Sequence, residues 1–363
     1  MSEVSFFRKI IIFIFFSLLV LCILYVPRVF EYFKGADKTI NILSFIEMIS
    51  PESVKIFEKQ TGVPVKVTYF ESGDELLAKM KINKGKGYDF LVVSDYVVEL
   101  LRKANFLKEI DVKKISNFKN LNKDFLRRYF DPENKFSVPY VWTAYGFAYY
   151  KEFFGGEIEN PSLDLIFKIQ DKYKISMPSN AREAVFLAAK YLFGKTQDLN
   201  DVQLLEVQKL LTKQKEIVEC YTSEKQDYLL YAEVVPLAVS ESSFVRKMHI
   251  DSDEAKEKFG FVIPREGSMF SIENLVVLKS STKKDEQIYT FIDFLLSAKI
   301  SALNANLYGI NPVNKLSYPM LDSEFVSDDS YFPSKELMGK MGTLRNDIPL
   351  SKIDGLWLAV KTG

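Results

Sequence analysis

Apolar and polar positions alternate in blocks along the chain from residue 38 onward. Three short apolar blocks are typical of buried strands: residues 39–45, 63–70 and 88–93. Two blocks between them carry apolar side chains at helical spacing: residues 51–60 and 74–82. Ser50, Pro51 and Gly62 suit the two ends of the first of these helices. Strands that alternate with helices predict an α/β fold with a parallel sheet wrapped by helices.

A second group of strands and helices begins at residues 136–150, one long apolar segment that we expect to run from one lobe into another. Further helices are predicted at 180–194, 199–214 and 285–299, and further strands at 234–240, 260–264 and 274–278. A chain of 363 residues is too long for one ordinary core. The pattern therefore predicts two lobes.

The N-terminus carries the strongest membrane signal. Residues 10–26 are uncharged and apolar, follow two basic residues, and end at a proline. This run predicts an anchor in the inner membrane, with residues 1–9 in the cytoplasm, 27–37 as a tether and the rest in the periplasm. Two alternatives stay open, a signal segment that is cleaved and acylation of Cys22.

Composition narrows the function classes. Lys+Arg and Asp+Glu both total 48, so no overall field favours nucleic acid as a partner. Two cysteines and one histidine exclude a zinc cluster and a disulfide framework, and they leave little for nucleophilic catalysis. We therefore expect no metal, no cofactor and no enzyme activity.

Candidate binding residues follow the predicted strands. In open α/β sheets, ligands bind beyond the carboxyl ends of the strands. Glu47 comes just after the first strand, and Ser94 and Tyr96 come just after the third. Glu47 stands among apolar residues, where burial of a carboxylate is unfavourable without a positive partner.

Several stretches, taken in order, resemble the spermidine/putrescine-binding component of ABC importers. They are EKQTGVPVKVTYFESGDELLAKM, GYDFLVVSDYVVELLRK, ISNFKNLN, FDPENKFSVPYVW, NAREAVF, IPREG and FIDFLL. The resemblance runs from about residue 39 to at least 315, and FDPENKFSVPYVW together with NARE is its most specific part.

The resemblance implies a type II periplasmic-binding-protein fold whose two lobes close on a ligand by hinge motion. Each lobe would hold a mixed, mostly parallel sheet flanked by helices. Lobe 1 would comprise 38–144 and 272–318, and lobe 2 would comprise 145–271 and 319–363. The implied function is capture of a polyamine and its delivery to permease subunits, without catalysis.

The resemblance also implies a set of ligand contacts, because a polyamine needs carboxylates for its ammonium groups and aromatic faces for its methylenes. Glu47, Glu183 and Glu273 would hold ammonium groups. Phe45 and Tyr96 would pack along the stem, and Ser94 and Asn180 would add polar contacts. Other positions differ from the family pattern and would reshape the pocket: Met48, Glu241, Ser271 and Arg345.

Each carboxylate also has an alternative reading from the sequence. Glu47 precedes a helix N-terminus, which favours a negative charge, and Asn180 and Glu183 have the spacing of a capping box. Glu273 can face solvent at the start of its strand. If instead the carboxylates share one cleft, mutual repulsion and burial should raise some of their pKa values in the empty protein.

Three other functions remain open at this stage. Arg345 would repel a polyamine unless a carboxylate such as Glu241 pairs with it. Together with the missing family tryptophans, it favours the same fold with an amino-acid-like cargo that has an anionic end. An enzyme with a two-lobed cleft and a surface interaction protein with a vestigial cleft are the further alternatives.

Overall fold

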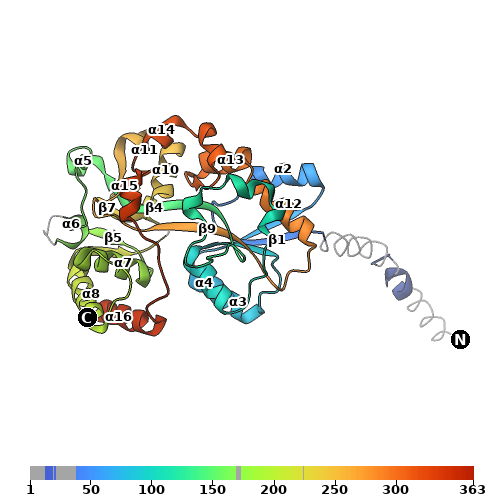
Figure 1. Ribbon diagram of the computed structural model, residues 1–363, viewed down its shortest axis with the longest axis horizontal. Coiled ribbons are helices and arrows are strands. Elements are labelled where there is room, and N and C mark those ends of the chain that lie inside the picture. The colour runs from blue at the N-terminus through green and yellow to red at the C-terminus, as the bar shows by residue number, and fades with distance from the viewer. Residues whose placement is uncertain (1–12, 19, 22–37, 169–172, 224) are drawn as a thin grey trace.

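The structure is a computed structural model that describes residues 13–18, 20–21, 38–168, 173–223 and 225–363. Two α/β lobes lie side by side, and strands β4 and β9 run between them (Figure 1). No helix within the described ranges is long and apolar enough to cross a membrane. Most of the predicted anchor, residues 10–26, falls outside those ranges.

The first lobe is built on the sheet order β2-β1-β3-β9-β4, with β10 also paired to β4. Its strands are β1 (Ile40–Phe45), β2 (Val65–Phe70), β3 (Phe90–Ser94), β9 (Phe270–Val277), the first half of β4 (Val138–Tyr150) and β10 (Asn311–Pro312). Its main helices are α2 (Pro51–Thr61), α3 (Gly73–Asn83), α4 (Asp95–Lys103), α12 (Asp285–Leu295) and α13 (Ala298–Tyr308). Helices α2, α12 and α13 cover one face, and α3 and α4 cover the other (Figure 1).

Local chemistry sets the bounds of α2 close to the predicted ones. The Ser50 side chain accepts a hydrogen bond from the Ser53 N–H, and Pro51 occupies the first turn, where no N–H is needed. Gly62 ends the helix with φ of 66°, in the left-handed region that glycine tolerates. These end signals were visible in the sequence.

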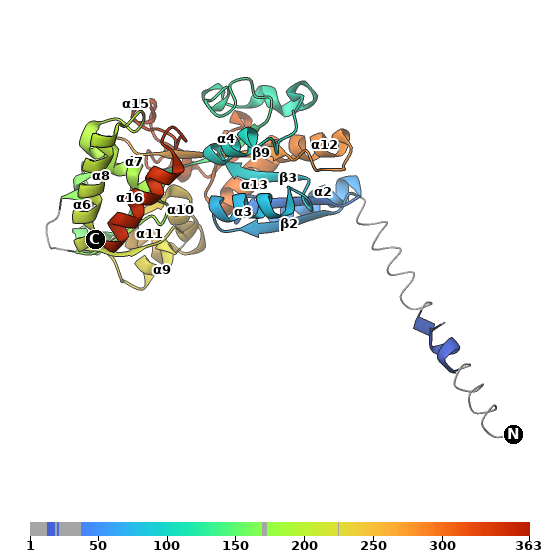
Figure 2. The ribbon, with the colours of Figure 1, turned by 90° about the horizontal axis from the view of Figure 1, so that it is seen from below.

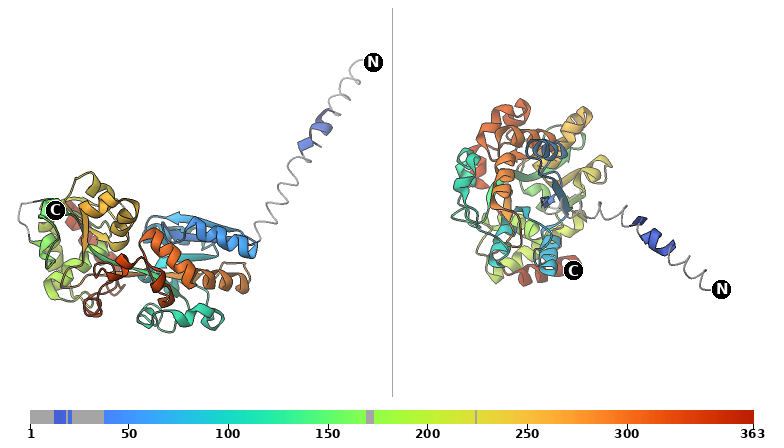
Figure 3. Two further views of the ribbon diagram at one scale, coloured as in Figure 1. Left: turned by 90° about the horizontal axis from the view of Figure 1, so that it is seen from above. Right: turned by 90° about the vertical axis from the view of Figure 1, so that its right-hand side faces the viewer.

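The second lobe pairs the other half of β4 with β7 (Leu237–Glu241) and β8 (Phe259–Val262), and continues to β5 (Ile175–Met177) and β6 (Val218–Tyr221). Its longer helices are α7 (Ala181–Phe193), α8 (Asp201–Gln214), α10 (Ser242–Asp251) and α16 (Leu350–Thr362). Short helices fill the connections: α5 (Lys151–Phe154), α6 (Asp164–Phe167), α9 (Gln226–Tyr231), α11 (Asp253–Lys258), α14 (Ser323–Ser327) and α15 (Lys335–Lys340). The C-terminus lies in this lobe, away from β1 and α2 (Figure 2, Figure 3).

Strand β4 changes partners in its middle. Ala144 pairs with Phe270 of β9, and the next residue, Tyr145, pairs with Glu241 of β7. The long segment predicted to pass between lobes therefore does so. The turn before it is held by Asp131, whose carboxylate accepts hydrogen bonds from three successive backbone N–H groups and the Ser137 hydroxyl. The lobe bounds given above stay predictions.

The sheets are mixed, as expected, but they are not mostly parallel. Among the described strands, four pairings are parallel and five are antiparallel. All five antiparallel pairings involve β4 or β9. These two strands carry the chain across and back in opposite directions, which makes their pairings antiparallel.

Candidate functional site

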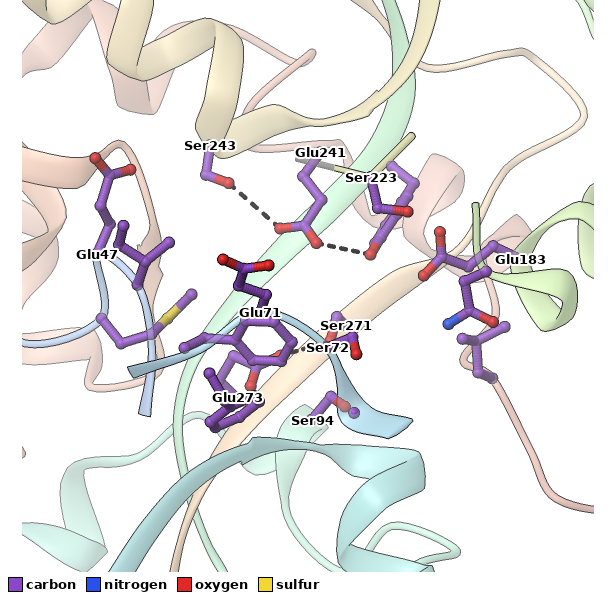
Figure 4. A pocket seen from close by; sticks show the side chains of 18 of the residues that line it. Glu47, Glu71, Ser72, Ser94, Glu183, Ser223, Glu241, Ser243, Ser271 and Glu273 are labelled. Carbon is purple, nitrogen blue, oxygen red and sulfur yellow. Dashed lines mark hydrogen bonds between the residues drawn. The ribbon is translucent and has the colours of Figure 1, made fainter. Parts of the chain in front are cut away.

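A cleft of about 780 Å³ lies between the lobes and is lined by side chains of both (Figure 4). Ten of the predicted site residues line it: Phe45, Glu47, Met48, Ser94, Tyr96, Asn180, Glu183, Glu241, Ser271 and Glu273. Arg345 does not. The structure thus brings together residues that are separated by more than 200 positions in the sequence.

The loop that carries Glu47 is held in place by hydrogen bonds from buried residues of the first lobe. The Tyr140 hydroxyl donates to the Met48 carbonyl at 3.0 Å, and the Asn304 amide donates to the same hydroxyl at 2.8 Å. Glu47 itself has φ of 62°, a left-handed backbone that is uncommon for a residue with a side chain. The Glu47 side chain is half-buried at the cleft. Burial of Tyr308, together with the nearby Tyr69 and the negative charge of Glu47, raises the pKa of Tyr308 to about 12.

Ser94 and Glu273 meet because β3 and β9 place them directly opposite each other. Each is only 5% exposed. The Ser271 hydroxyl donates to Glu273 Oε1 at 2.8 Å, but the buried Glu273 Oε2 and Ser94 Oγ have no hydrogen-bond partner among the described residues. Two orphaned polar atoms at one point of a cleft are unfavourable unless a ligand supplies donors or acceptors.

Glu241, at the end of β7, is held by neutral donors. The Tyr145 hydroxyl donates to Oε1 at 2.7 Å, while the hydroxyls of Thr143 and Ser243 donate to Oε2 at 3.0 and 3.4 Å. Among the described residues, no ion pair joins Glu241 to Arg345, so the pairing that the sequence left open does not form.

Arg345 lies outside the cleft lining, with its guanidinium 4.7 Å from the centre of the Tyr129 ring. The Tyr129 hydroxyl donates to the carbonyl of Leu344, which fixes this segment against the first lobe. A cation over an aromatic face is already stabilised, so Arg345 needs no carboxylate partner. The structure thus places Arg345 apart from the ten predicted residues that line the cleft.

Asn180 is the N-cap of α7, and its side chain accepts a hydrogen bond from the Arg182 N–H at 3.0 Å. The capping box that was the alternative reading for Asn180 and Glu183 does not form, because the Glu183 N–H donates to the backbone carbonyl of Asn180 and not to its side chain. Glu183, in the first turn of α7, is 7% exposed and lines the cleft. The start of α7 therefore places Glu183 at the cleft, which Asn180 also lines.

Glu183, Glu241 and Glu273 have no lysine or arginine beside them among the described residues. Burial, together with the charge of Glu241, raises the pKa of Glu183 and of Glu273 to about 8. Burial also raises the pKa of Glu241. Hydrogen bonds only partly oppose these shifts, whose direction agrees with the expectation for carboxylates that share one cleft.

Aromatic rings form much of the remaining wall. The rings of Phe45 and Phe70 are 4.4 Å apart, centre to centre, and both line the cleft. Tyr96 is 7% exposed, and the Arg182 guanidinium from the other lobe lies 5.4 Å from its ring centre. One face of Tyr96 is thus used by Arg182, which leaves less of the ring for a ligand.

Sequence reasoning missed several polar lining residues, among them Glu71, Asp95 and Tyr145. Asp95 is buried between Ser94 and Tyr96 in the chain, and burial raises its pKa to about 8. Glu71 follows β2 directly, so the strand-end rule that selected Glu47 applies to it as well. Tyr145 stands in the crossing segment, where nothing in the sequence marks it.

The fold and this cleft together define a receptor that encloses a solute between two α/β lobes. The chain belongs to the family described as bacterial extracellular solute-binding protein, whose profile matches residues 52–334.

Individual relatives are similar over most of their length. A putrescine/agmatine-binding protein of Pseudomonas aeruginosa is 28% identical over 346 residues, which cover 91% of this chain and 93% of the relative. The spermidine/putrescine-binding periplasmic protein of Escherichia coli is 27% identical, with coverage of 86% and 88%. Among solved structures, a spermidine/putrescine ABC transporter substrate-binding protein of Streptococcus pneumoniae superposes with a TM-score of 0.78 at 25% identity, covering 89% of this chain and 98% of that one.

Proposed function

We propose that this chain is the extracytoplasmic receptor of an ABC importer, and that it captures a polyamine in the cleft and delivers it to the permease without catalysing a reaction. Relatives named for spermidine and putrescine support this assignment. The family indicates a solute-binding receptor, and the side chains that line the cleft indicate which solute it binds.

One observation carries the proposal: two buried carboxylates, Glu183 and Glu273, and the half-buried Glu241 come from both lobes and share a cleft that no described lysine or arginine lines. Burial of an ionised carboxylate without a positive partner is unfavourable, so in the empty cleft these groups are pushed toward the protonated form. A linear cation that enters the cleft supplies the missing donors. Ammonium to carboxylate hydrogen bonds out of water are among the stronger ones in proteins.

The form of the cleft favours an organic cation over a metal ion. Among the described residues, no group of three histidine, cysteine, aspartate or glutamate side chains converges closely enough to hold a metal. Phe45, Phe70, Tyr69, Phe270 and Tyr308 also line the cleft. Such rings suit the methylenes and the charge of a polyamine, at about 0.5–2 kcal/mol for each well-placed cation–π contact.

The proposal includes a place in the cell. The family is extracellular, and we propose that residues 10–26 hold the receptor at the inner membrane with residues 38–363 in the periplasm. The lobes would be 38–144 with 272–318, and 145–271 with 319–363. Expression with a reporter after residue 37 and after residue 363 tests this orientation, which predicts periplasmic signals from both fusions.

The alternative cargo with an anionic end loses its main support. It depended on Arg345 in the binding site, and Arg345 lies over Tyr129 outside the cleft lining. No other lysine or arginine among the described residues lines the cleft.

A ligand titration of the purified full chain tests the proposed cargo. Putrescine and spermidine should raise the melting temperature and bind in calorimetry, because a ligand that binds only the folded state stabilises it. 1,4-Butanediol has the length of putrescine without its charge and serves as the matched control; glutamate tests the anionic alternative. If neither polyamine binds at millimolar concentration, the proposed cargo is wrong.

A further inference from the structure

Glu241 holds a middle position among the three uncompensated carboxylates. Its charge raises the pKa of both Glu183 and Glu273. The Tyr145 hydroxyl, which donates to Glu241, is affected by all three charges. Figure 4 shows the three side chains reaching the cleft from different parts of the chain.

Hydrogen bonds set the order of these groups along the cleft. Thr143 of β4 and Ser271 of β9 are register partners; the Thr143 hydroxyl donates to Glu241, and the Ser271 hydroxyl donates to Glu273, so these two carboxylates lie beside each other. The Tyr145 hydroxyl, which donates to Glu241, also opposes the rise in the pKa of Glu183 by a hydrogen bond. The acidic groups therefore form a row in the order Glu183, Glu241 and Glu273, and among the described residues they do not converge closely enough to hold a metal.

The hydrogen bonds of Glu241 leave room for one more donor. A carboxylate offers about four acceptor positions, and the hydroxyls of Thr143, Tyr145 and Ser243 use three. These donors are neutral, so they fix the direction of the carboxylate without cancelling its charge. At one end of the row, the buried Oε2 of Glu273 and Oγ of Ser94 also lack partners, which points to a ligand at that end.

We infer that Glu241 binds an internal ammonium group of a linear ligand whose terminal ammonium groups lie near Glu183 and Glu273. The cleft then selects a triamine over a diamine of the same length. This inference rests on the proposed function. A methylene placed opposite Glu241 would leave a fixed carboxylate without its cation, and sites built to bind a polar group reject analogues that lack it.

The test compares spermidine with 1,8-diaminooctane, which has the same chain length but a methylene in place of the internal nitrogen. Calorimetry on the full chain should show spermidine binding at least about tenfold more tightly. In Glu241→Gln the preference should fall to within about threefold, because the amide keeps the shape and removes the charge. Glu336→Gln, which removes an exposed carboxylate on α15, is the charge-matched control and should keep the wild-type preference.

Equal affinity of the wild-type protein for both ligands overturns the inference without any variant, and so does an unchanged preference in a folded Glu241→Gln protein. In both cases polyamines still bind, so the proposed function survives. Failure of the wild-type protein to bind putrescine, spermidine or 1,8-diaminooctane overturns the proposed function and this inference with it.

Discussion

Binding of a polyamine should release protons from the cleft. In the empty protein, burial raises the pKa of Glu183 and of Glu273 to about 8. At pH 7 each of these carboxyls is therefore about 90% protonated. An ammonium group at hydrogen-bonding distance stabilises the ionised form and lowers its pKa to well below about 6, so each occupied carboxyl loses its proton. Two such groups give roughly two protons released at pH 7.

The same linkage fixes how affinity changes with pH. Each proton released strengthens binding about tenfold per pH unit, so affinity should rise between pH 6 and pH 7 by about tenfold for each carboxyl involved. The ligand stays charged over this range, because primary amines of the lysine type have a pKa of about 10.4. The slope should flatten above pH 8, where the empty cleft is already ionised.

Calorimetry at one pH in phosphate, HEPES and Tris buffers measures the proton count, because the observed enthalpy varies with the ionisation enthalpy of the buffer. The Glu183→Gln, Glu273→Gln double variant should release fewer protons than the wild-type protein. An enthalpy that is independent of buffer, together with an affinity that is independent of pH, would refute the reasoning that these carboxyls are neutral when the cleft is empty.

Three further predictions concern stability and single residues. The folded-state pKa of about 8 for Glu183 and Glu273 lies above the ordinary 4.5, so the empty protein should lose stability as pH rises from about 4.5 to about 8. Melting curves should show this loss, with a smaller dependence on pH in Glu273→Gln. A melting temperature that rises with pH would contradict it. Arg345→Gln should change spermidine affinity by less than about threefold, because a charge outside the cleft is screened, and a larger loss in calorimetry would return Arg345 to the site. Arg182→Ala should weaken spermidine binding by up to about tenfold, because Arg182 bridges the lobes through the Tyr96 ring. Lys190→Ala on the same helix is the control. If both variants change spermidine affinity equally, Arg182 has no bridging role.

Local features of the fold were predictable from the sequence. The ends of α2 depend on Ser50, Pro51 and Gly62, which lie next to the residues they affect. Strand direction was not predictable, because the apolar pattern of β9 is the same whether its neighbours run with it or against it. The error about mostly parallel sheets has this origin.

The site was predictable only in part. Glu47 follows β1 and Ser94 ends β3, and the strand-end rule identifies both from the sequence. The meeting of Ser94 with Glu273 depends on a register between strands far apart in the chain, which the sequence does not show; the resemblance implied only that both residues contact the ligand. Tyr145 was missed because the face of the sheet on which its side chain lies depends on the pleat of β4. The pairing of β4 with β9 shifts between Pro139 and Val141, and the sequence does not show this irregularity.

The misplaced Arg345 has a different cause. A guanidinium has several possible partners, and the sequence does not show that the Tyr129 ring lies nearer than a carboxylate. Glu241 was expected to pair with it, but three hydroxyls hold that carboxylate instead. Competition between alternative partners is decided by tertiary packing.

A crystal structure of the full chain grown with spermidine tests the central claim most directly. The account predicts ligand density in the cleft, with amine nitrogens about 2.7–2.9 Å from the carboxylates of Glu183 and Glu273. A cleft in which these carboxylates instead contact lysine or arginine side chains, or a ligand bound elsewhere on the protein, would contradict it.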